Sequence, residues 1–231
     1  MPKIAIIIKQ KHGANSVPVL LKHLYICSIL FLGLLTQPSF ASEQSELRIA
    51  VAANFTPVLK KLLTDFHQQT GIKTQLISGA SGAMFLQIKH GAPFDIFLSA
   101  DSRRPKQLEY DGLILENSRK TYALGQLALF SHGRLTDLTQ LKQFNHLPNS
   151  SMRFAMANPE ISPYGQAAKE TLQHLHLWKN YRSSLITGIN ISQTFNQIRS
   201  KSVKAGIVAN SQLVLNNLTG IIIPSDHHQP I

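Results

Sequence analysis

The feature that most constrains the fold is an alternation of strand-like and helix-like segments from residue 47 onward. Short apolar runs such as Leu47–Ala52 and Phe94–Leu98 are typical of buried strands. Between them, apolar residues recur at helical spacing, as in residues 55–69, which Gly71 ends. A β-α-β-α order of this kind predicts α/β architecture, with a mostly parallel sheet covered by helices.

The alternation occurs twice, which predicts two α/β lobes. The expected strands are 47–52, 73–78, 94–98, 122–130, 153–157, 184–187, 205–208 and 220–223, and the expected helices are 55–69, 82–90, 103–111, 137–144, 164–175, 191–199 and 210–217. We assign residues 42–124 plus part of 210–231 to the first lobe and residues 125–209 to the second. The chain is expected to cross between lobes near 122–130 and near 209–220.

The first 41 residues differ in composition from the rest. They contain four lysines and no acidic residue, then an apolar run of 12 residues from Leu24 to Leu35, and they end in Ser39-Phe40-Ala41. This pattern predicts a secretory signal peptide at 1–41, cleaved after Ala41, and a periplasmic protein. An uncleaved membrane anchor is the alternative, although a spanning helix needs roughly 20 apolar residues.

Charge and cysteine content limit the function classes. After residues 1–41, the chain has 19 Lys and Arg residues (23 minus 4) and 12 acidic residues, so its net charge is about +7 (19 minus 12). This charge is scattered rather than gathered into a basic stripe, so nucleic-acid binding is not expected. The single cysteine, Cys27, lies in the predicted signal, so the exported chain has no disulfide.

Four short segments stand where an expected strand gives way to an expected helix. They are Ala52–Phe55, Gly79–Gly82, Ser162–Gly165 and Gly188–Ile191. Ligands of α/β folds sit beyond the carboxyl ends of strands, where helix starts offer free N–H groups and the positive end of the helix dipole. Four helix starts that meet at a cleft between two lobes therefore predict a site for a small anion.

Other chemistry is weakly indicated. His174 and His176 are two residues apart on an expected helix and make a poor metal pair, and Asp226-His227-His228 is interpreted as a surface tract at a frayed end. Asp95 and Asp101, near strand ends, are expected to be structural. No cofactor and no directly ligated cation are expected. A serine hydrolase acting from Ser81 is an alternative, but Ala83 breaks the G-x-S-x-G motif.

The four segments and their surroundings resemble the periplasmic molybdate-binding proteins of ABC importers. The matching stretches run in the same order along the chain: Val51–Thr56, Gln87–Asp101, Ala157–Ala168, Asn190–Thr194 and Ala205–Ala209. The resemblance implies a two-lobed type II periplasmic binding protein fold that closes on molybdate or tungstate. It also implies a monomer that is no enzyme, that delivers its ligand to an ABC permease with its ATPase, and that meets the membrane only through the permease.

Carried over to this chain, the resemblance implies that neutral donors hold the oxyanion. These are Asn54, Ser81, Tyr164 and Ile191, with Ala53 and Gly82 in a second layer around the ligand. Some relatives have a ligand-binding tyrosine where this chain has Ala209, and Asn54 is expected to take over part of that role.

The end of the chain departs from the family pattern. The family continues past the position of Ile231 with a strand and helices that return to the first lobe, so the fold is expected to be truncated at its C-terminus. Two further alternatives stay open: a binding protein for another oxyanion or small solute, and a truncated remnant that binds nothing.

Overall fold

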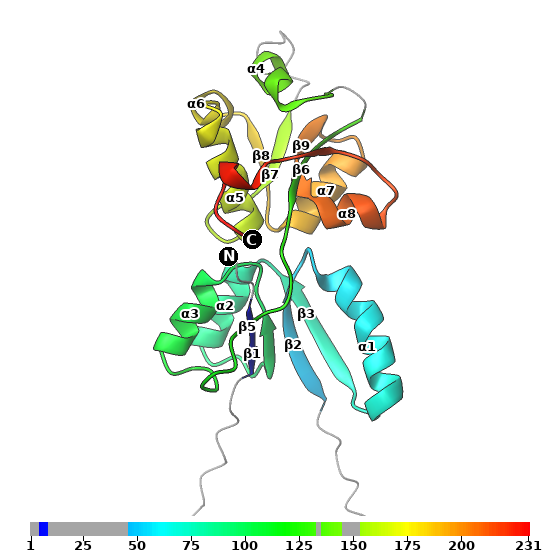
Figure 1. Ribbon diagram of the computed structural model, residues 1–231, viewed down its shortest axis with the longest axis vertical. Helices are drawn as coiled ribbons and strands as arrows, with labels where there is room; N and C mark the ends of the chain where they lie inside the picture. Colours follow the sequence, from blue (N-terminus) through cyan, green and yellow to red (C-terminus); the bar gives the residue numbers. More distant parts are fainter. Residues whose placement is uncertain (1–4, 9–45, 133–134, 145–152) are drawn as a thin grey trace, which may run out of the picture.

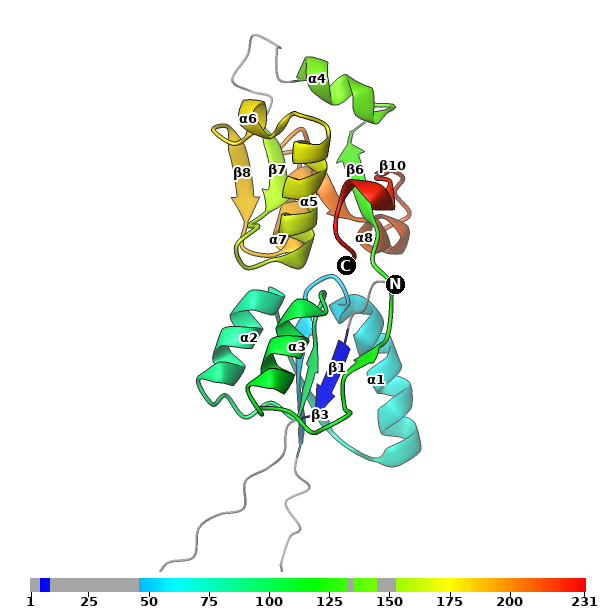
Figure 2. The same cartoon turned by 60° about the vertical axis from the view of Figure 1, so that its left-hand side comes forward.

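Two α/β lobes stacked along the long axis make up the protein (Figure 1). The computed structural model describes residues 5–8, 46–132, 135–144 and 153–231. Each lobe contains one five-stranded sheet with helices packed against it, and Figure 2 shows the two sheets one above the other. Among the described residues, no helix combines the length and apolar character needed to cross a membrane.

The first lobe alternates strands and helices much as the sequence predicts. Its elements are β1 (Ala5–Ile8), β2 (Leu47–Ala52), α1 (Thr56–Thr70), β3 (Thr74–Gly79), α2 (Ser81–Lys89), β4 (Ile96–Leu98), α3 (Arg103–Tyr110) and β5 (Lys120–Thr121). α1 ends at Gly71, whose positive φ of 69° forms a left-handed cap.

The second lobe contains the rest of the described chain. Its elements are β6 (Leu127–Ser131), η1 (Leu138–Gln140), α4 (Leu141–Phe144), β7 (Phe154–Ala157), α5 (Pro163–His174), α6 (Trp178–Tyr181), β8 (Leu185–Gly188), α7 (Ile191–Arg199), β9 (Ala205–Ala209), α8 (Asn210–Leu215), β10 (Ile221–Ile222) and η2 (Ser225–His227). The largest cluster of buried apolar side chains lies mainly here and includes Leu172 and Ile207, both fully buried, but it extends to Ala52, Ala53 and Ala100 of the first lobe.

The two sheets share one arrangement. The strand orders are β3-β2-β4-β1-β5 and, read from its other edge, β8-β7-β9-β6-β10. In each sheet the first three strands are parallel, while the fourth and fifth join through antiparallel ladders. The expectation of mostly parallel sheets is therefore corrected: each sheet is mixed, with three parallel strands and two strands joined by antiparallel pairing. The reason is that the fourth strand of each sheet does not belong to a β-α-β unit with its neighbours.

The structure changes the expected lobe boundaries at two places. The segment 122–130 is not one long strand. β5 ends at Thr121, residues 122–126 form a connection that runs between the lobes in Figure 1, and β6 begins at Leu127 in the second sheet. No part of 210–231 joins the first sheet. Instead, β10 pairs with β6, and Leu213 of α8 is fully buried in a cluster of the second lobe. Gly220 permits this close approach to β6, because a Cβ there would come within 2.7 Å of the Leu129 carbonyl oxygen.

β1 comes from a part of the chain that the sequence predicts to be removed. It pairs antiparallel with β4, where Ile7 is opposite Phe97, and with β5, where Ile6 is opposite Lys120. Residues 5–8 thus hold the fourth position of the first sheet. The predicted cleavage point, Ala41, lies outside the described residues.

Candidate functional site

The four strand-to-helix segments meet at one small cavity between the lobes. It is lined by Ala52, Ala53, Asn54, Gly79, Ala80, Ser81, Ala100, Ser162, Pro163, Tyr164, Asn190 and Ile191. β2 and β3 lead to Asn54 and Ser81, and the equivalent strands β7 and β8 lead to Tyr164 and Ile191. The structure therefore brings all four predicted ligand-binding residues to the same point, two from each lobe.

The start of α5 leaves one backbone donor for the cavity. Pro163 begins the helix and has no N–H, and Gly165 donates its N–H to the Ser162 hydroxyl oxygen at 3.3 Å. Between them, the N–H of Tyr164 lies in the first turn, where no helical carbonyl can accept it. The sequence Ser-Pro-Tyr-Gly thus singles out the Tyr164 N–H as the donor that faces the cavity side of the helix start.

The start of α7 reaches the same result by a different cap. The Asn190 side chain accepts from the N–H groups of Ser192 and Gln193, both at 3.0 Å, and the Asn190 carbonyl accepts from the Thr194 N–H at 3.2 Å. These bonds use the first-turn donors that follow Ile191 and leave the Ile191 N–H free of an intrahelical partner.

Ser81 is the first residue of α2 and is fully buried. Its hydroxyl oxygen accepts from the Ala100 N–H at 2.9 Å. Since that bond fills an acceptor position, the hydroxyl proton remains available as a donor. Ser81 can therefore offer both its O–H and its helix-start N–H to a ligand in the cavity.

Asn54 and Tyr164 join the two lobes at the cavity. The Asn54 side-chain nitrogen donates to the Tyr164 hydroxyl at 3.3 Å, and the Asn54 side-chain oxygen is buried with no partner among the described residues. Burial raises the pKa of the Tyr164 hydroxyl, which therefore stays neutral at physiological pH. A neutral hydroxyl can both donate and accept, so rotating the Asn54 amide by 180° keeps its hydrogen bond with Tyr164, with the hydroxyl now donating to the amide oxygen. The same rotation places the Asn54 NH₂ where the unpaired oxygen now lies.

The lobes are closed on each other. Besides Asn54–Tyr164, Gly82 donates its N–H to the Ile161 carbonyl at 2.8 Å, and the Ser192 hydroxyl donates to the Ala53 carbonyl at 3.1 Å. The space left in the cavity is about 10 Å³ for the centre of a water-sized sphere, which is close to what one water molecule needs. A drug-sized molecule does not fit this space.

The cavity is neutral. Of the described residues that line it, none carries an acidic, basic or histidine side chain. Asp101, which follows the lining residue Ala100, forms an ion pair with Arg104. A serine hydrolase would need a base beside Ser81, and the lining residues supply none. The donor set suits an anion that only accepts hydrogen bonds.

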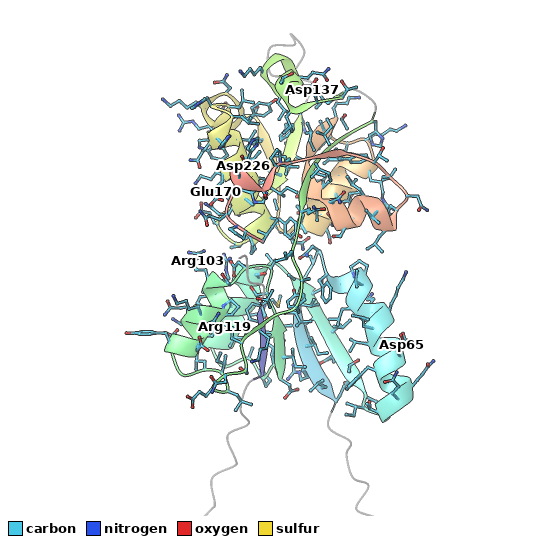
Figure 3. The ribbon with its side chains drawn as sticks, in the orientation of Figure 1. Asp65, Arg103, Arg119, Asp137, Glu170 and Asp226 are labelled. Carbon is cyan, nitrogen blue, oxygen red and sulfur yellow. The ribbon has the colours of Figure 1, made fainter. Side chains whose placement is uncertain are left out.

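A wider cavity of about 850 Å³ lies at the rim between the lobes. Its lining includes Arg103 of the first lobe and Glu170 of the second, both labelled in Figure 3, together with Lys169. Its charged lining residues and larger volume distinguish this rim from the neutral inner cavity.

Some predicted residues lie elsewhere. Gly82 is outside the lining of the inner cavity, since its N–H is used by Ile161, whereas Ala53 lines it. Asp95 accepts from the Arg48 N–H at 2.8 Å, so it is structural, as expected, and Asp101 does the same for Arg104. Asn54 does not cap α1, whose cap position is Phe55.

The described histidines give no indication of a metal site. Among the described residues, no cluster of three or more His, Cys, Asp or Glu side chains could hold a metal ion. The interpretation of residues 226–228 as a frayed end is wrong, because the His227 ring stacks on the His174 ring of α5 with 4.1 Å between centroids. A stacked pair across two elements holds this segment against the second lobe.

Three supporting residues were missed at the sequence level. They are Asn190, Ser192 and Gln212, which shape the start of α7 and its contact with the first lobe. Asn190 had a readable signal, because a capping Asn followed by Gln193 three residues later resembles a capping box. The Gln193 side chain does fold back, but it accepts from the Ile189 N–H at 2.6 Å, one residue before the cap. Ser192 and Gln212 had none, since their roles depend on contacts between distant segments.

Comparison with known proteins identifies the family of the chain. A family model described as bacterial extracellular solute-binding protein matches residues 47–231. The chain belongs to this family. Solute-binding proteins are not an enzyme family, and their fold here is the two-lobed type II periplasmic binding protein fold.

Several relatives of this solute-binding protein are named as molybdate-binding proteins. The chain is 36% identical over 200 residues to the molybdate-binding protein ModA of Azotobacter vinelandii, covering 83% of this chain and 77% of the relative. It is 35% identical over 189 residues to the protein of the same name from Rhodobacter capsulatus, covering 80% and 73%. The solved periplasmic molybdate-binding protein of A. vinelandii superposes with a TM-score of 0.73 at 31% identity, covering 80% of this chain and 82% of that one.

Proposed function

We propose that this solute-binding protein captures molybdate or tungstate between its lobes and delivers the oxyanion to an ABC importer. The observation that carries the proposal is the meeting of four uncharged helix starts at one small, buried cavity. The relatives named molybdate-binding protein support the same ligand class.

The ligand donors under this proposal are Asn54, Ser81, Tyr164 and Ile191. Asn54 and Ser81 contribute side-chain donors, Ser81 adds its N–H, and Tyr164 and Ile191 contribute backbone N–H groups. Hydrogen bonds to a charged partner contribute about 1.5–3 kcal/mol each, more than neutral ones. Preorganised donors in a closed cavity can therefore hold a dianion without a counter-charge. Ala53 lies in the second layer, and no resident cofactor takes part.

Selection among oxyanions follows from protonation and size. A doubly charged tetrahedral anion accepts hydrogen bonds at all four oxygens. Phosphate near neutral pH keeps a proton that would need an acceptor. In the described cavity the unpaired Asn54 oxygen could accept that proton only while the Asn54 amide keeps its present orientation. Sulfate differs from molybdate in size alone, so the closed distance between the lobes decides between those two.

Delivery requires export and recognition of the closed form. The signal peptide proposed at 1–41, with cleavage after Ala41, would place the protein in the periplasm. An ABC permease and its ATPase would then distinguish the closed, loaded monomer from the open form, since closing joins surfaces of both lobes into one.

Isothermal titration of the purified protein with molybdate, tungstate, sulfate and phosphate tests the proposal. We expect heat and a 1:1 end point with molybdate and tungstate, and binding at least a hundredfold weaker with sulfate. Tighter sulfate binding would reassign the site to another oxyanion. Absence of heat with all four anions would overturn the proposal.

A further inference from the structure

A buried amide outside the cavity contacts the part of the second lobe that closes on the first. Gln212 of α8 is 5% exposed. Its side-chain nitrogen donates to the Ile191 carbonyl and to the Ser192 hydroxyl oxygen, each at 3.3 Å, and its side-chain oxygen accepts from the Ala209 N–H at 3.3 Å. One side chain therefore connects the end of β9, α8 and the start of α7.

The contacts form a directed chain that crosses between the lobes. Gln212 donates to the Ser192 hydroxyl, and that hydroxyl donates its only proton to the Ala53 carbonyl of the first lobe at 3.1 Å. A hydroxyl has one proton and two acceptor positions. As long as Gln212 occupies an acceptor position, the Ser192 proton is directed at Ala53. Chains of this kind strengthen their own members.

The hydrogen-bond chain runs from the Ile191 carbonyl through Gln212 and Ser192 to the Ala53 carbonyl, and both end residues border the inner cavity. Ile191 and Ala53 line it, and Ala53 precedes Asn54. The amide that fixes the peptide after Ile191 is thus the same one that orients the bond closing the lobes. One side chain therefore contacts both the residue that carries the proposed donor and the hydroxyl that bonds across the lobes.

We propose that Gln212 is a positioning residue that couples ligand binding at the start of α7 to closure of the lobes through Ser192. This inference rests on the proposed function, because the coupled event is oxyanion binding. The simpler reading is that Gln212 only caps α8, through its bond with Ala209. A helix cap would stabilise the second lobe, and the effect of removing it on ligand affinity would not depend on Ser192.

A double-mutant cycle separates the two readings. Gln212→Leu, Ser192→Ala and the double variant are titrated with molybdate beside the unsubstituted full chain. We expect Ser192→Ala to weaken binding about tenfold, the effect of losing one hydrogen bond of roughly 1.4 kcal/mol. Gln212→Leu also loses the bonds to Ile191 and Ala209 and should weaken binding at least as much. The double change should weaken binding by clearly less than the product of the two single effects. Additive losses, or unchanged affinity of Gln212→Leu, would overturn the inference.

Asn216→Ala is the matched control. The Asn216 side chain donates to the Gln212 backbone carbonyl at 2.8 Å, so its removal disturbs the same helix without touching Ile191 or Ser192. We expect a lower melting temperature and unchanged affinity. An equal loss of affinity in Asn216→Ala would mean that any damage to α8 weakens binding, and the positioning role would be rejected.

Gln212→Glu adds a test that a cap alone would not pass. The carboxylate keeps an acceptor for Ala209 but cannot donate to Ser192 or to the Ile191 carbonyl, whereas the protonated acid can donate once. Burial beside acceptors raises the pKa of such a carboxyl. Affinity relative to the unsubstituted chain should therefore rise as pH falls from 8 to 5.5, and a pH-independent ratio would contradict the proposal.

The same titrations distinguish failure of the proposed function from failure of the Gln212 inference alone. If the unsubstituted chain releases no heat with molybdate or tungstate, the proposed function fails and the inference fails with it. If the unsubstituted chain binds and the Gln212 variants bind equally well, only the inference fails.

Discussion

The two lobes have equivalent sheets but obtain their fourth strand from different places. In the second lobe that strand is β6, which pairs with β9 at five positions and follows directly from the connection between lobes. In the first lobe it is β1, which pairs with β4 at three positions and comes from residues 5–8. All five strands of the second sheet thus come from one continuous part of the chain, residues 127–222, whereas the first sheet takes a strand from a distant segment.

The lobes also differ in how they present their donors. In the proposed site, the first lobe supplies the side chains of Asn54 and Ser81 together with the Ser81 N–H, while the second supplies only the backbone N–H groups of Tyr164 and Ile191. Replacing a side chain removes a donor only in the first lobe. Equivalent positions in similar sheets are therefore expected to respond differently to mutation.

The largest expected difference concerns one glycine in each lobe. A Cβ at Gly165 would lie 2.7 Å from the backbone carbonyl carbons of Ala157 and Asn158, inside the second lobe. Gly165→Ala should lower the free energy of unfolding by about 3 kcal/mol. A Cβ at Gly82 would meet the Ile161 carbonyl oxygen at 2.7 Å, across the cleft, and separation of the lobes relieves that contact.

Gly82→Ala should therefore melt near the unsubstituted temperature and adopt a more open shape. Thermal melts combined with small-angle X-ray scattering check both variants. A large drop in melting temperature for Gly82→Ala, with no increase in radius of gyration, would show that the lobes do not move as units.

The next difference concerns ligand affinity. Ser81→Ala removes a hydroxyl donor and should weaken molybdate binding about ten- to hundredfold, since a hydrogen bond to a charged group contributes about 1.5–3 kcal/mol. Ile191→Ala keeps its N–H and should change affinity by less than about fivefold. Calorimetric titration of both variants checks the contrast, and equal losses would contradict the division into side-chain and backbone donors.

A smaller effect tests the source of the fourth strand. In a Cys27→Ser background, the pair Ile6→Cys and Lys120→Cys occupies opposite positions of β1 and β5, at a spacing that a disulfide can bridge. The uncleaved chain should form this cross-link under mild oxidation. The control pair Ile7→Cys and Lys120→Cys should not, because neighbouring strand residues face opposite sides of the sheet.

Hydrogen exchange extends the same test to stability. Ile7→Pro removes a backbone donor from a strand paired on both sides, which should speed exchange in β4 while leaving β9 unchanged. Equal cross-linking of both cysteine pairs, or slow exchange in β4 of the proline variant, would remove β1 from the first sheet.

The smallest effect is a pH dependence confined to the second lobe. Burial, and then the neighbouring His174, lower the pKa of His227 below its usual value of 6.5. The unfolded segment therefore binds a proton more readily than the docked one. Docking of residues 225–231 should weaken as pH falls through 6.5, by less than about 1 kcal/mol. Exchange of these amides at pH 7.5 and 5.5 measures it, and His227→Gln should abolish the difference.

Much of the fold could be predicted because local and tertiary preferences agree. The helix expected at 191–199 is observed at those bounds, and the strand at 47–52 likewise. The misassigned regions are those where pairing over long distances decides. Residues 122–126 have strand-like sequence but connect the lobes, and β1 has three consecutive isoleucines within a segment whose composition predicts a signal peptide.

The sequence alone determined where the donors arise. Caps, prolines and glycines act within a few residues, so Ser-Pro-Tyr-Gly and Asn-Ile-Ser-Gln already specify which N–H groups stay free at α5 and α7. Only the tertiary structure decided that these donors meet in one neutral cavity, that Gly82 contacts the opposite lobe instead, and that Gln212 reaches Ile191 and Ser192. Such contacts join residues 20 or more positions apart, and no local preference encodes which distant partner a side chain will find.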